Sequence, residues 1–370
     1  MDPLVVEAMQ PYFSEKFFNP SSPYAAGVAV KRDYQAAKAR IAQVLGVVAD
    51  ELVMTAGATE SVNLAFQAAQ QTTCAVATIE HASVLSAAGR YAKPVLIQPD
   101  HKGRISPEAV KQALTPEVGF VSIALANHEL GYVQPIEEIA RVIQVERERR
   151  QSAGESTPLL FHTDASQAAA LLDVKVKRLG VDLLTLSAAK VYGPKQVGLL
   201  WVRPGVHIAA TIVGGGQELG LRSGTENVAG VVGFAEALEL AAKRRKTEVK
   251  RLQGLRDGMI QKLKAELPEM IISSDRKKSL ANFLNISFPG LDAERLVFFL
   301  EMHGVMVATG SACAANSGTR SHVLSAIGLS DSDIDGSLRI THGRVKDEAA
   351  GSRAAELIIQ SVRKEQERMR

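Results

Sequence analysis

The chain has 370 residues, of which 46% are hydrophobic and 22% are charged, as in a globular protein with room for two domains. Its 43 basic and 40 acidic residues leave a net charge of +3, which is too small to favour nucleic acid or a membrane surface as a partner. Eight histidines and two cysteines show no metal-ligand spacing, so we expect neither a metal site nor a disulfide framework. No apolar run is long enough to span a membrane and the first residues do not form a signal peptide, so we expect a cytoplasmic protein.

The first part of the chain predicts a helical arm followed by an alternation of strands and helices. Segment 30–45 has the composition of an amphipathic helix. From residue 50 onward, short apolar runs alternate with helix-like segments, which is typical of βαβ units and predicts a mostly parallel sheet covered by helices. The runs are 52–55, 74–79, 120–125, 159–162 and 183–186, and the helix-like segments include 61–70 and 136–150.

The alternation ends near residue 240, where segment 228–266 predicts a long helix whose basic run, 243–246, forms a solvated face. A strand at 282–288, a helix at 292–302, a second short strand–helix set and a charged terminal helix follow. We therefore divide the α/β chain into a large domain with a helical arm, 1–245, and a smaller α+β domain, 246–370.

Segment 183–201 is the first candidate site, because it reads as a strand, a tight loop and a second strand. Lys190 lies in that loop beside Ala188 and Ala189. Apolar surroundings would favour the neutral amine, which can form a Schiff base with a carbonyl cofactor. A surface lysine in a hairpin loop is the alternative.

Other candidates follow the apolar runs, because ligands of parallel sheets bind beyond the carboxyl ends of the strands. After 52–55, a turn of small residues opens a helix at which Ala58 and Thr59 could hold a phosphate, or at which Thr59 or Ser61 is only a cap. After 74–79 comes His81, which could stack on a flat ring, move protons or be structural.

After 159–162 comes Asp164, whose carboxylate could pair with a protonated ring nitrogen or cap a helix, and Gln167 could reach the same ligand. The two cysteines differ in context. Cys74 lies in an apolar run and is most simply a buried core thiol, whereas Cys313 lies in a loop of small residues that favours a reactive thiol.

Taken together, these motifs resemble the cysteine desulfurases, the pyridoxal-phosphate enzymes of the class V aminotransferase family. The resemblance implies the fold-type I architecture of these enzymes, and the loop from Cys313 to His322 is similar to the long form in the group linked to iron–sulfur assembly. The matching motifs cover nearly the whole chain in the family's order: GATES (57–61), EH (80–81), HELG (128–131), DASQ (164–167), SAAKVYGPK (187–195), GGGQE (214–218), RSGTEN (222–227), GSAC (310–313) and SLRITHGR (337–344).

The resemblance implies roles around the cofactor, pyridoxal 5'-phosphate. Lys190 would form the Schiff base with it and later move the Cα proton of the substrate. Asp164 would pair with the pyridinium nitrogen, Gln167 would hydrogen-bond the ring oxygen, and His81 would stack on the ring.

The resemblance also implies that residues from two subunits hold each cofactor phosphate. Ala58, Thr59 and Ser187 would hold the phosphate of the chain's own cofactor. Thr225 would reach the phosphate in the neighbouring subunit, which implies a homodimer.

The substrate implied is L-cysteine. Arg339 would bind its carboxylate as a bidentate fork, and His128 occupies a position near the ring and that carboxylate. Cys313 would take the sulfur as a persulfide, alanine would leave, and the sulfur would pass to an acceptor protein for iron–sulfur clusters, thio-cofactors or tRNA.

The sequence departs from the family pattern at several points. Ala189 stands where a histidine usually precedes the lysine, and His128 stands where asparagine is usual; Asn127 could replace that asparagine only if the strand end shifts by one residue, which would reverse its side-chain direction. The chain begins at Met1 without the family's preceding segment and ends without the extension that some relatives use to dock a scaffold.

We expect an active desulfurase, which these departures could make slow or specialised. Two other interpretations remain: a selenocysteine lyase or another class V lyase, in which Cys313 would be dispensable, and a degenerate scaffold subunit that partners an active paralogue.

Overall fold

The computed structural model describes residues 1–70, 72–310, 320–344 and 349–369. They divide into two compact units, and helix α8 (Val228–Glu266) contributes residues to both. Unit 1 comprises Met1–Ile97, Ser106–Leu125 and Pro135–Arg245, and unit 2 comprises Gln98–Ile105, Ala126–Gln134 and Lys246–Arg370.

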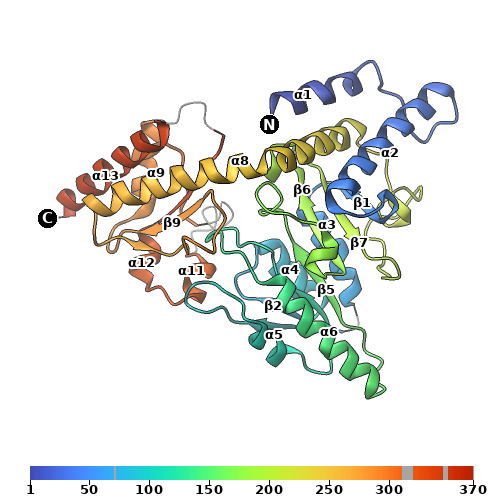
Figure 1. Cartoon of the computed structure of the whole chain (residues 1–370), viewed down its shortest axis with the longest axis horizontal. Helices are drawn as coiled ribbons and strands as arrows, with labels where there is room; N and C mark the ends of the chain where they lie inside the picture. Colours follow the sequence, from blue (N-terminus) through green and yellow to red (C-terminus); the bar gives the residue numbers. More distant parts are fainter. Residues whose placement is uncertain (71, 311–319, 345–348, 370) are drawn as a thin grey trace. The chain divides into compact units, whose positions relative to one another are not determined.

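Among the described residues, a seven-stranded sheet forms the centre of unit 1, with the order β1-β7-β6-β5-β4-β2-β3 (Figure 1). The pairs β2–β3, β2–β4, β4–β5 and β5–β6 are parallel, and only β7 runs antiparallel to its neighbours β6 and β1. This confirms the predicted mostly parallel sheet. The strands are β1 Leu52–Thr55, β2 Thr73–Ala77, β3 Pro94–Ile97, β4 Val118–Ser122, β5 Leu160–Asp164, β6 Leu183–Ser187 and β7 Gly198–Val202.

The strands fold as they do because their side chains are apolar on both faces, which suits a sheet covered by helices on both sides. All residues of β1, β4 and β7 are buried. Phe66 and Phe120 pack with ring centroids 4.8 Å apart in the core beneath helices α3 and α4. His162 is a polar exception in this core, and it is satisfied there by Ser122 at 2.8 Å and Thr185 at 2.9 Å.

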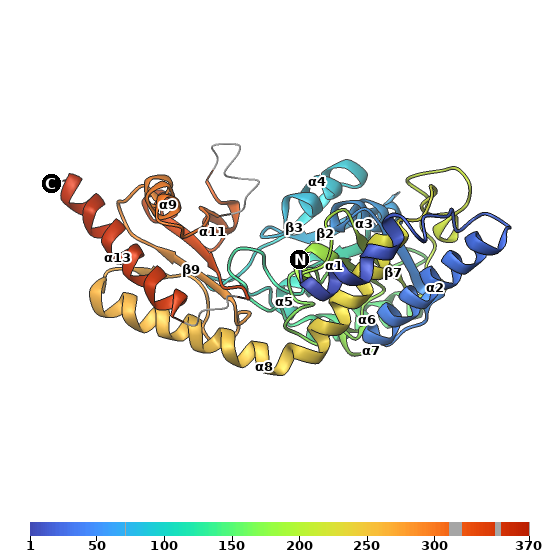
Figure 2. The ribbon, with the colours of Figure 1, turned by 90° about the horizontal axis from the view of Figure 1, so that it is seen from above.

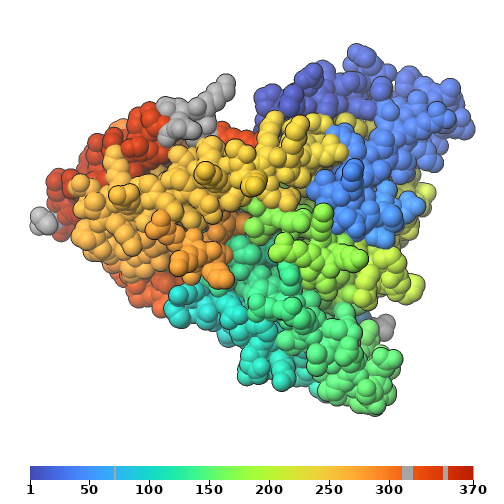
Figure 3. Space-filling view, viewed as in Figure 1, coloured from blue at the N-terminus to red at the C-terminus, as the bar shows by residue number. Residues whose placement is uncertain are grey.

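Helices cover the sheet of unit 1 and build its N-terminal arm. Arg40 of α2 pairs with Glu236 and Glu239 of α8, and Figure 3 shows the blue arm against the yellow residues of α8. Gly46, with φ +72°, ends α2 in the left-handed conformation that glycine adopts most readily. The α-helices are α1 Pro3–Met9, α2 Ala25–Leu45, α3 Ala58–Ala65, α4 Ala82–Tyr91, α5 Pro107–Ala113, α6 Ile136–Ser152 and α7 Val176–Leu179.

Unit 2 is built on a small antiparallel sheet of order β10-β9-β8, with helices α9 and α13 packed together on it (Figure 2). Its core joins Leu284 and Leu338 from the sheet with Leu300 and Ile358 from these helices. The elements are β8 Ile271–Ile272, β9 Phe283–Ser287, α9 Ala293–Met302, α11 His322–Ala326, α12 Asp331–Asp335, β10 Ser337–Thr341 and α13 Ala350–Met369. In the part of the chain that the structure describes, none of the helices could cross a membrane.

Candidate active site

The strands that precede the candidate cofactor residues all end at one edge of the unit 1 sheet. Strands β2, β5 and β6 run in the same direction through their parallel neighbours. Strand β1 shares this direction because it is antiparallel to β7, which is itself antiparallel to β6. The residues that follow these four strands therefore lie along one edge, where ligands of such sheets bind.

The turn after β1 leaves the N-terminus of helix α3 open. Its N-cap is Gly57, and no side chain caps the helix. The alternative interpretation of Thr59 or Ser61 as a cap is therefore wrong: the Ser61 hydroxyl instead bonds the Thr55 hydroxyl at 2.7 Å and the Gly57 carbonyl at 3.2 Å. The first amides of a helix have no partner within it, and together with the helix dipole they bind anions. Ala58 lies in this first turn, and Thr59 is exposed beside it.

Two glycines shape this turn. A Cβ at Gly57 would meet nothing within 4 Å, so there is open space where a ligand can approach the backbone. Gly198 of β7 lies behind the turn, and a Cβ there would come within 2.6 Å and 2.7 Å of two backbone atoms of Gly57. Only a glycine at position 198 allows this close approach, and the sequence motifs did not single it out.

Lys190 lies on the short helix η4 (Ala188–Val191), directly after β6. Ser187 is half-buried, but the side chain of Lys190 is exposed, so the expected apolar enclosure of the amine is wrong for this chain. Its neighbour Ala189 is exposed as well, whereas Ala188 is buried. The turn itself is well held, because Gly193 N–H donates to the Ala188 carbonyl at 2.9 Å.

Asp164 is the last residue of β5 and Gln167 follows the strand; both side chains are half-buried. One carboxylate oxygen of Asp164, Oδ1, accepts a bond from Ser166 N–H at 2.9 Å, and its backbone carbonyl accepts one from Leu125 N–H at 2.9 Å. These bonds fix the carboxylate at the end of the strand.

His81 follows β2 as the N-cap of α4. Its Nδ1 accepts a bond from Ser83 N–H at 3.1 Å and lies 2.9 Å from the Ser83 hydroxyl. The imidazole is half-buried, and this cap sets its orientation at the sheet edge.

Glu80 is a buried acid that the motifs did not single out beyond its place in the EH pair. Its Oε1 accepts a bond from Ala124 N–H at 2.9 Å, which ties the end of β2 to the segment after β4. Burial, with a smaller contribution from the nearby Asp164 carboxylate, raises the pKa of Glu80 to about 8, and the bond from Ala124 N–H opposes this rise. A charged residue at the end of an apolar run is the only sequence signal that could have found it.

Arg339 and His128 lie together in unit 2. The Nη1 of Arg339 donates to the His128 carbonyl at 3.1 Å, while its buried Nε has no hydrogen-bond partner among the described residues. Burial lowers the pKa of the Arg339 guanidinium, and the Glu129 carboxylate opposes this shift. A half-buried guanidinium with an unused donor suits a carboxylate ligand.

The Asn127 side chain is part of the turn around His128. The Asn127 side chain accepts bonds from Glu129 N–H at 2.9 Å and Leu130 N–H at 2.8 Å, so it is used within its own turn. Glu129 in turn accepts a bond from the Ser321 hydroxyl at 2.6 Å.

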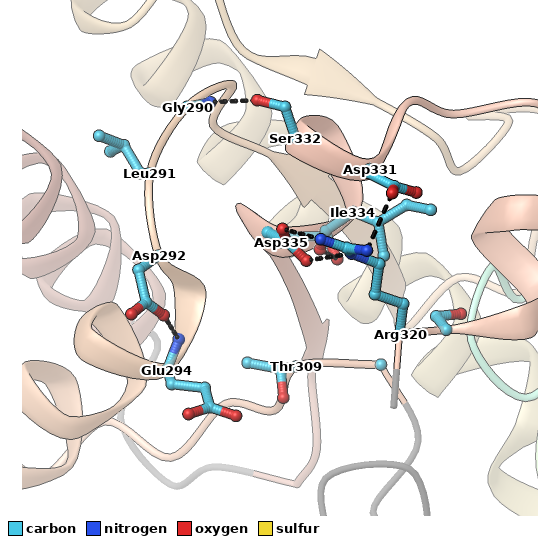
Figure 4. A pocket seen from close by; sticks show the side chains of 13 residues that line it. Gly290, Leu291, Asp292, Glu294, Thr309, Arg320, Asp331, Ser332, Ile334 and Asp335 are labelled. Carbon is cyan, nitrogen blue, oxygen red and sulfur yellow. Dashed lines mark hydrogen bonds and ion pairs between the residues drawn. The ribbon is translucent and has the colours of Figure 1, made fainter. Parts of the chain in front are cut away.

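Cys313 lies outside the described residues. The described residues on either side, Gly310 and Arg320, line a pocket of about 590 Å³ in unit 2 (Figure 4). The Arg320 guanidinium pairs with Asp335 at 2.7 Å and with Asp331 at 2.9 Å. Figure 4 shows these side chains pointing toward one another. This pocket holds none of the candidate cofactor residues. Thr225 is exposed, three residues after Arg222 in unit 1.

The amino-acid sequence is similar to those of known proteins along most of its length. The profile described as Aminotransferase class-V matches residues 1–341. The chain belongs to the aminotransferase class V family. Within this family it is 36% identical over 368 residues to the "Cysteine desulfurase IscS 1" of Archaeoglobus fulgidus, covering 97% of this chain and 93% of that protein. It is 37% identical over 353 residues to the "Cysteine desulfurase IscS" of Clostridium botulinum strain Hall, covering 92% and 86%.

A solved structure shares the fold along nearly the whole chain. The structure named "NIFS-LIKE PROTEIN" superposes with a TM-score of 0.88 at 30% sequence identity, covering 97% of this chain and 95% of its own. The expected fold-type I architecture is thereby confirmed.

Proposed function

We propose that this protein is a pyridoxal-phosphate-dependent cysteine desulfurase that converts L-cysteine to L-alanine and transfers the sulfur to Cys313. One observation carries the proposal: an amine, a carboxylate, an imidazole and an uncapped helix N-terminus lie along a single edge of one sheet. The relatives named cysteine desulfurase support the choice of reaction within the class V family.

The residues at this edge fit pyridoxal phosphate. The open turn at Gly57, with its uncapped helix, suits a phosphate dianion, and Ala58, Thr59 and Ser187 would hold it. The Asp164 carboxylate suits a protonated pyridine nitrogen. Gln167 would bond the ring oxygen.

His81 and Lys190 complete the set. The imidazole of His81, oriented by its bond to Ser83, would stack on the ring. Lys190 would hold the cofactor covalently, and its exposure leaves the amine accessible.

When bound, the cofactor withdraws electrons from the amino acid and so makes its Cα–H bond acidic. The protein's own groups then do the remaining work. Lys190 would take the proton from the substrate Cα and return it. Arg339 would bind the substrate carboxylate through its guanidinium, whose buried Nε has no hydrogen-bond partner among the described residues, and so orient the amino acid.

The sulfur transfer balances without an added oxidant. The Cys313 thiolate would attack the substrate sulfur, the substrate Cβ–S bond would break, and its electron pair would leave with Cβ, which takes up a proton. Cysteine and a thiolate thus give alanine and a persulfide. The persulfide sulfur would pass to an acceptor protein for iron–sulfur clusters or for thiolation of cofactors or tRNA.

A homodimer is part of the proposal, because Thr225 would reach the cofactor phosphate of a second copy. Its exposure in the single chain leaves it available for that contact.

The test is the absorbance of the purified protein with pyridoxal phosphate, before and after L-cysteine is added, together with measurement of alanine and sulfide. Cys313→Ala should lose sulfide release under reducing conditions. Undiminished sulfur release from this variant would rule out the persulfide and favour a lyase that does not use Cys313.

A further inference from the structure

Segment 212–227 of unit 1 contains a strained backbone next to a buried anchor. Two non-glycine residues in it, Glu218 with φ +46° and Leu219 with φ +62°, adopt the left-handed conformation. Residues with a Cβ rarely do so, and such strain persists only where the surroundings impose it. Within the segment the chain turns back on itself, because Ser223 N–H donates to the Ile212 carbonyl at 2.9 Å.

The Glu218 carboxylate is the anchor. Its side chain is only 5% exposed, as is that of its partner Lys38, which donates to Oε2 at 3.1 Å. The Tyr34 hydroxyl donates to Oε1 at 2.5 Å, and burial raises the pKa of this phenol, so it stays a neutral donor. A third bond comes from the backbone, where Met54 N–H donates to Oε2 at 2.7 Å.

That backbone bond matters because β1 is an edge strand of the sheet. An edge strand has outward amides that no neighbouring strand satisfies. Amides two residues apart point to the same side, so those of Met54 and Ala56 both face away from β7. Glu218 accepts from the first, and Oε2 of Glu60 accepts from the second at 2.7 Å.

Segment 212–227 holds this second carboxylate as well. Arg222 donates through Nε to Oε1 of Glu60 at 3.0 Å. The segment thus fixes the outer side of β1 at both amides, immediately before the open turn at Gly57 and Ala58.

The charges are balanced in the same contacts. Glu218 and Glu60 are anionic groups close to a turn that suits a phosphate, and unpaired they would repel it. Lys38 neutralises the first carboxylate and Arg222 the second. The arrangement therefore orients two amides without leaving negative charge beside the turn.

We propose that Glu218 and Arg222 are positioning residues for the phosphate-binding turn, which they hold in place through the amides of Met54 and Ala56. The proposal rests on the proposed function, in which this turn holds the cofactor phosphate. Neither residue needs to touch the phosphate. The inference assigns segment 212–227 a role in the chain's own cofactor site, in addition to its expected contact with a second copy through Thr225.

The experiment compares ligands with and without a phosphate on apo-protein. Affinities for pyridoxal phosphate, pyridoxal and inorganic phosphate are measured by equilibrium dialysis for wild type, Glu218→Gln and Arg222→Gln. Each variant should lose about tenfold or more in affinity for pyridoxal phosphate and for inorganic phosphate. Affinity for pyridoxal, which has no phosphate to bind, should stay within about twofold of wild type.

Two further variants separate positioning from charge and from general damage. Arg222→Gln alone leaves the Glu60 carboxylate without its Arg222 partner. Combining Arg222→Gln with Glu60→Gln removes that negative charge as well, so part of the phosphate affinity should return. Arg40→Gln is the matched control, because Arg40 also pairs with glutamates in unit 1 but contacts α8 rather than β1, and it should bind every ligand as wild type does.

If Glu218→Gln does not fold, Glu218→Gln with Lys38→Met removes the buried pair together, and the same loss of phosphate affinity is expected. The proposal is overturned if folded variants bind inorganic phosphate and pyridoxal phosphate as wild type does, or if they lose pyridoxal equally. If the wild-type protein binds inorganic phosphate but no pyridoxal phosphate, the proposed function is contradicted instead. In that case the affinities of the variants for inorganic phosphate still decide whether Glu218 and Arg222 position the turn.

Discussion

Arg339 and Ala308 exchange two backbone hydrogen bonds: Arg339 N–H donates to the Ala308 carbonyl at 2.6 Å, and Ala308 N–H donates to the Arg339 carbonyl at 3.2 Å. Arg339 is the proposed ligand of the substrate carboxylate, and Ala308 lies five residues before Cys313 in the sequence. The carboxylate ligand and the chain that leads toward the proposed sulfur acceptor therefore form one backbone pair within unit 2.

Arg339→Lys should impair substrate binding, because a lysine cannot present the two donors of a guanidinium in a fixed plane. We expect kcat/KM for L-cysteine to fall about 100-fold, near the upper range for loss of a hydrogen bond to a charged group. Steady-state alanine production measures this. The control is Arg363→Lys on α13, whose surface pair with Glu266 should be dispensable. If the kcat/KM of Arg339→Lys stays within about twofold of the wild-type value, Arg339 does not bind the substrate carboxylate.

Gly198→Ala should displace the phosphate-binding turn. The new Cβ would lie 2.6 Å from the backbone of Gly57, where no flexible side chain can yield. We expect a loss of about 1–3 kcal/mol in the free energy of unfolding, with weaker binding of pyridoxal phosphate. Urea unfolding and cofactor titration check this.

The matched control is Gly258→Ala in α8, where an added Cβ meets nothing within 4 Å. It should stabilise the protein by up to about 1 kcal/mol, because alanine favours the helix. Equal behaviour of the two variants would show that the contact between Gly198 and Gly57 is unimportant.

Glu80→Gln should change how stability depends on pH. The unfolded chain ionises this carboxyl near its ordinary pKa of 4.5, whereas the folded chain, which buries it, raises the pKa to about 8. The folded state therefore holds one more proton between these values. The contribution of this proton to the free energy of unfolding is fully present below pH 4.5 and is lost as pH rises toward 8. Between these two pH values the free energy of unfolding falls by about 1.4 kcal/mol per pH unit.

In Glu80→Gln this decline should be absent, as urea unfolding across the pH range would show. Glu146→Gln provides a control of opposite sign. Bonds from Arg149 and Arg150 lower the pKa of Glu146 to about 2, so its contribution is present above pH 4.5 and lost as pH falls toward 2. An unchanged slope in Glu80→Gln would mean that Glu80 is ionised in the folded protein.

Much of the fold could be predicted from apolar runs. Segments 52–55 and 183–186 became β1 and β6 with errors of at most one residue, and the long helix at 228–266 has the observed bounds. Strand β3 (Pro94–Ile97) was missed although its residues are apolar, because it is only four residues long and begins with a proline. It lies at the sheet edge, with Leu96 52% exposed.

The sequence motifs named the candidate site residues, which stay a prediction, but they did not indicate the environment of those residues. The small residues around Lys190 led us to expect an enclosed amine, whereas the Lys190 side chain is exposed in the structure. Contacts between distant segments were out of reach. No local pattern indicates that Glu218 accepts a bond from Met54, or that Gly198 lies against Gly57, because both depend on how the strands pair.

The most direct test of the proposed function is the visible absorbance of Lys190→Ala beside wild type, each incubated with pyridoxal phosphate, desalted and then given L-cysteine. Wild type should retain a visible cofactor band, change it on addition of cysteine and produce alanine, whereas Lys190→Ala should retain no covalently bound cofactor and produce no alanine. A wild-type protein that retains no cofactor, or a Lys190→Ala variant that makes alanine at the wild-type rate, would contradict the account.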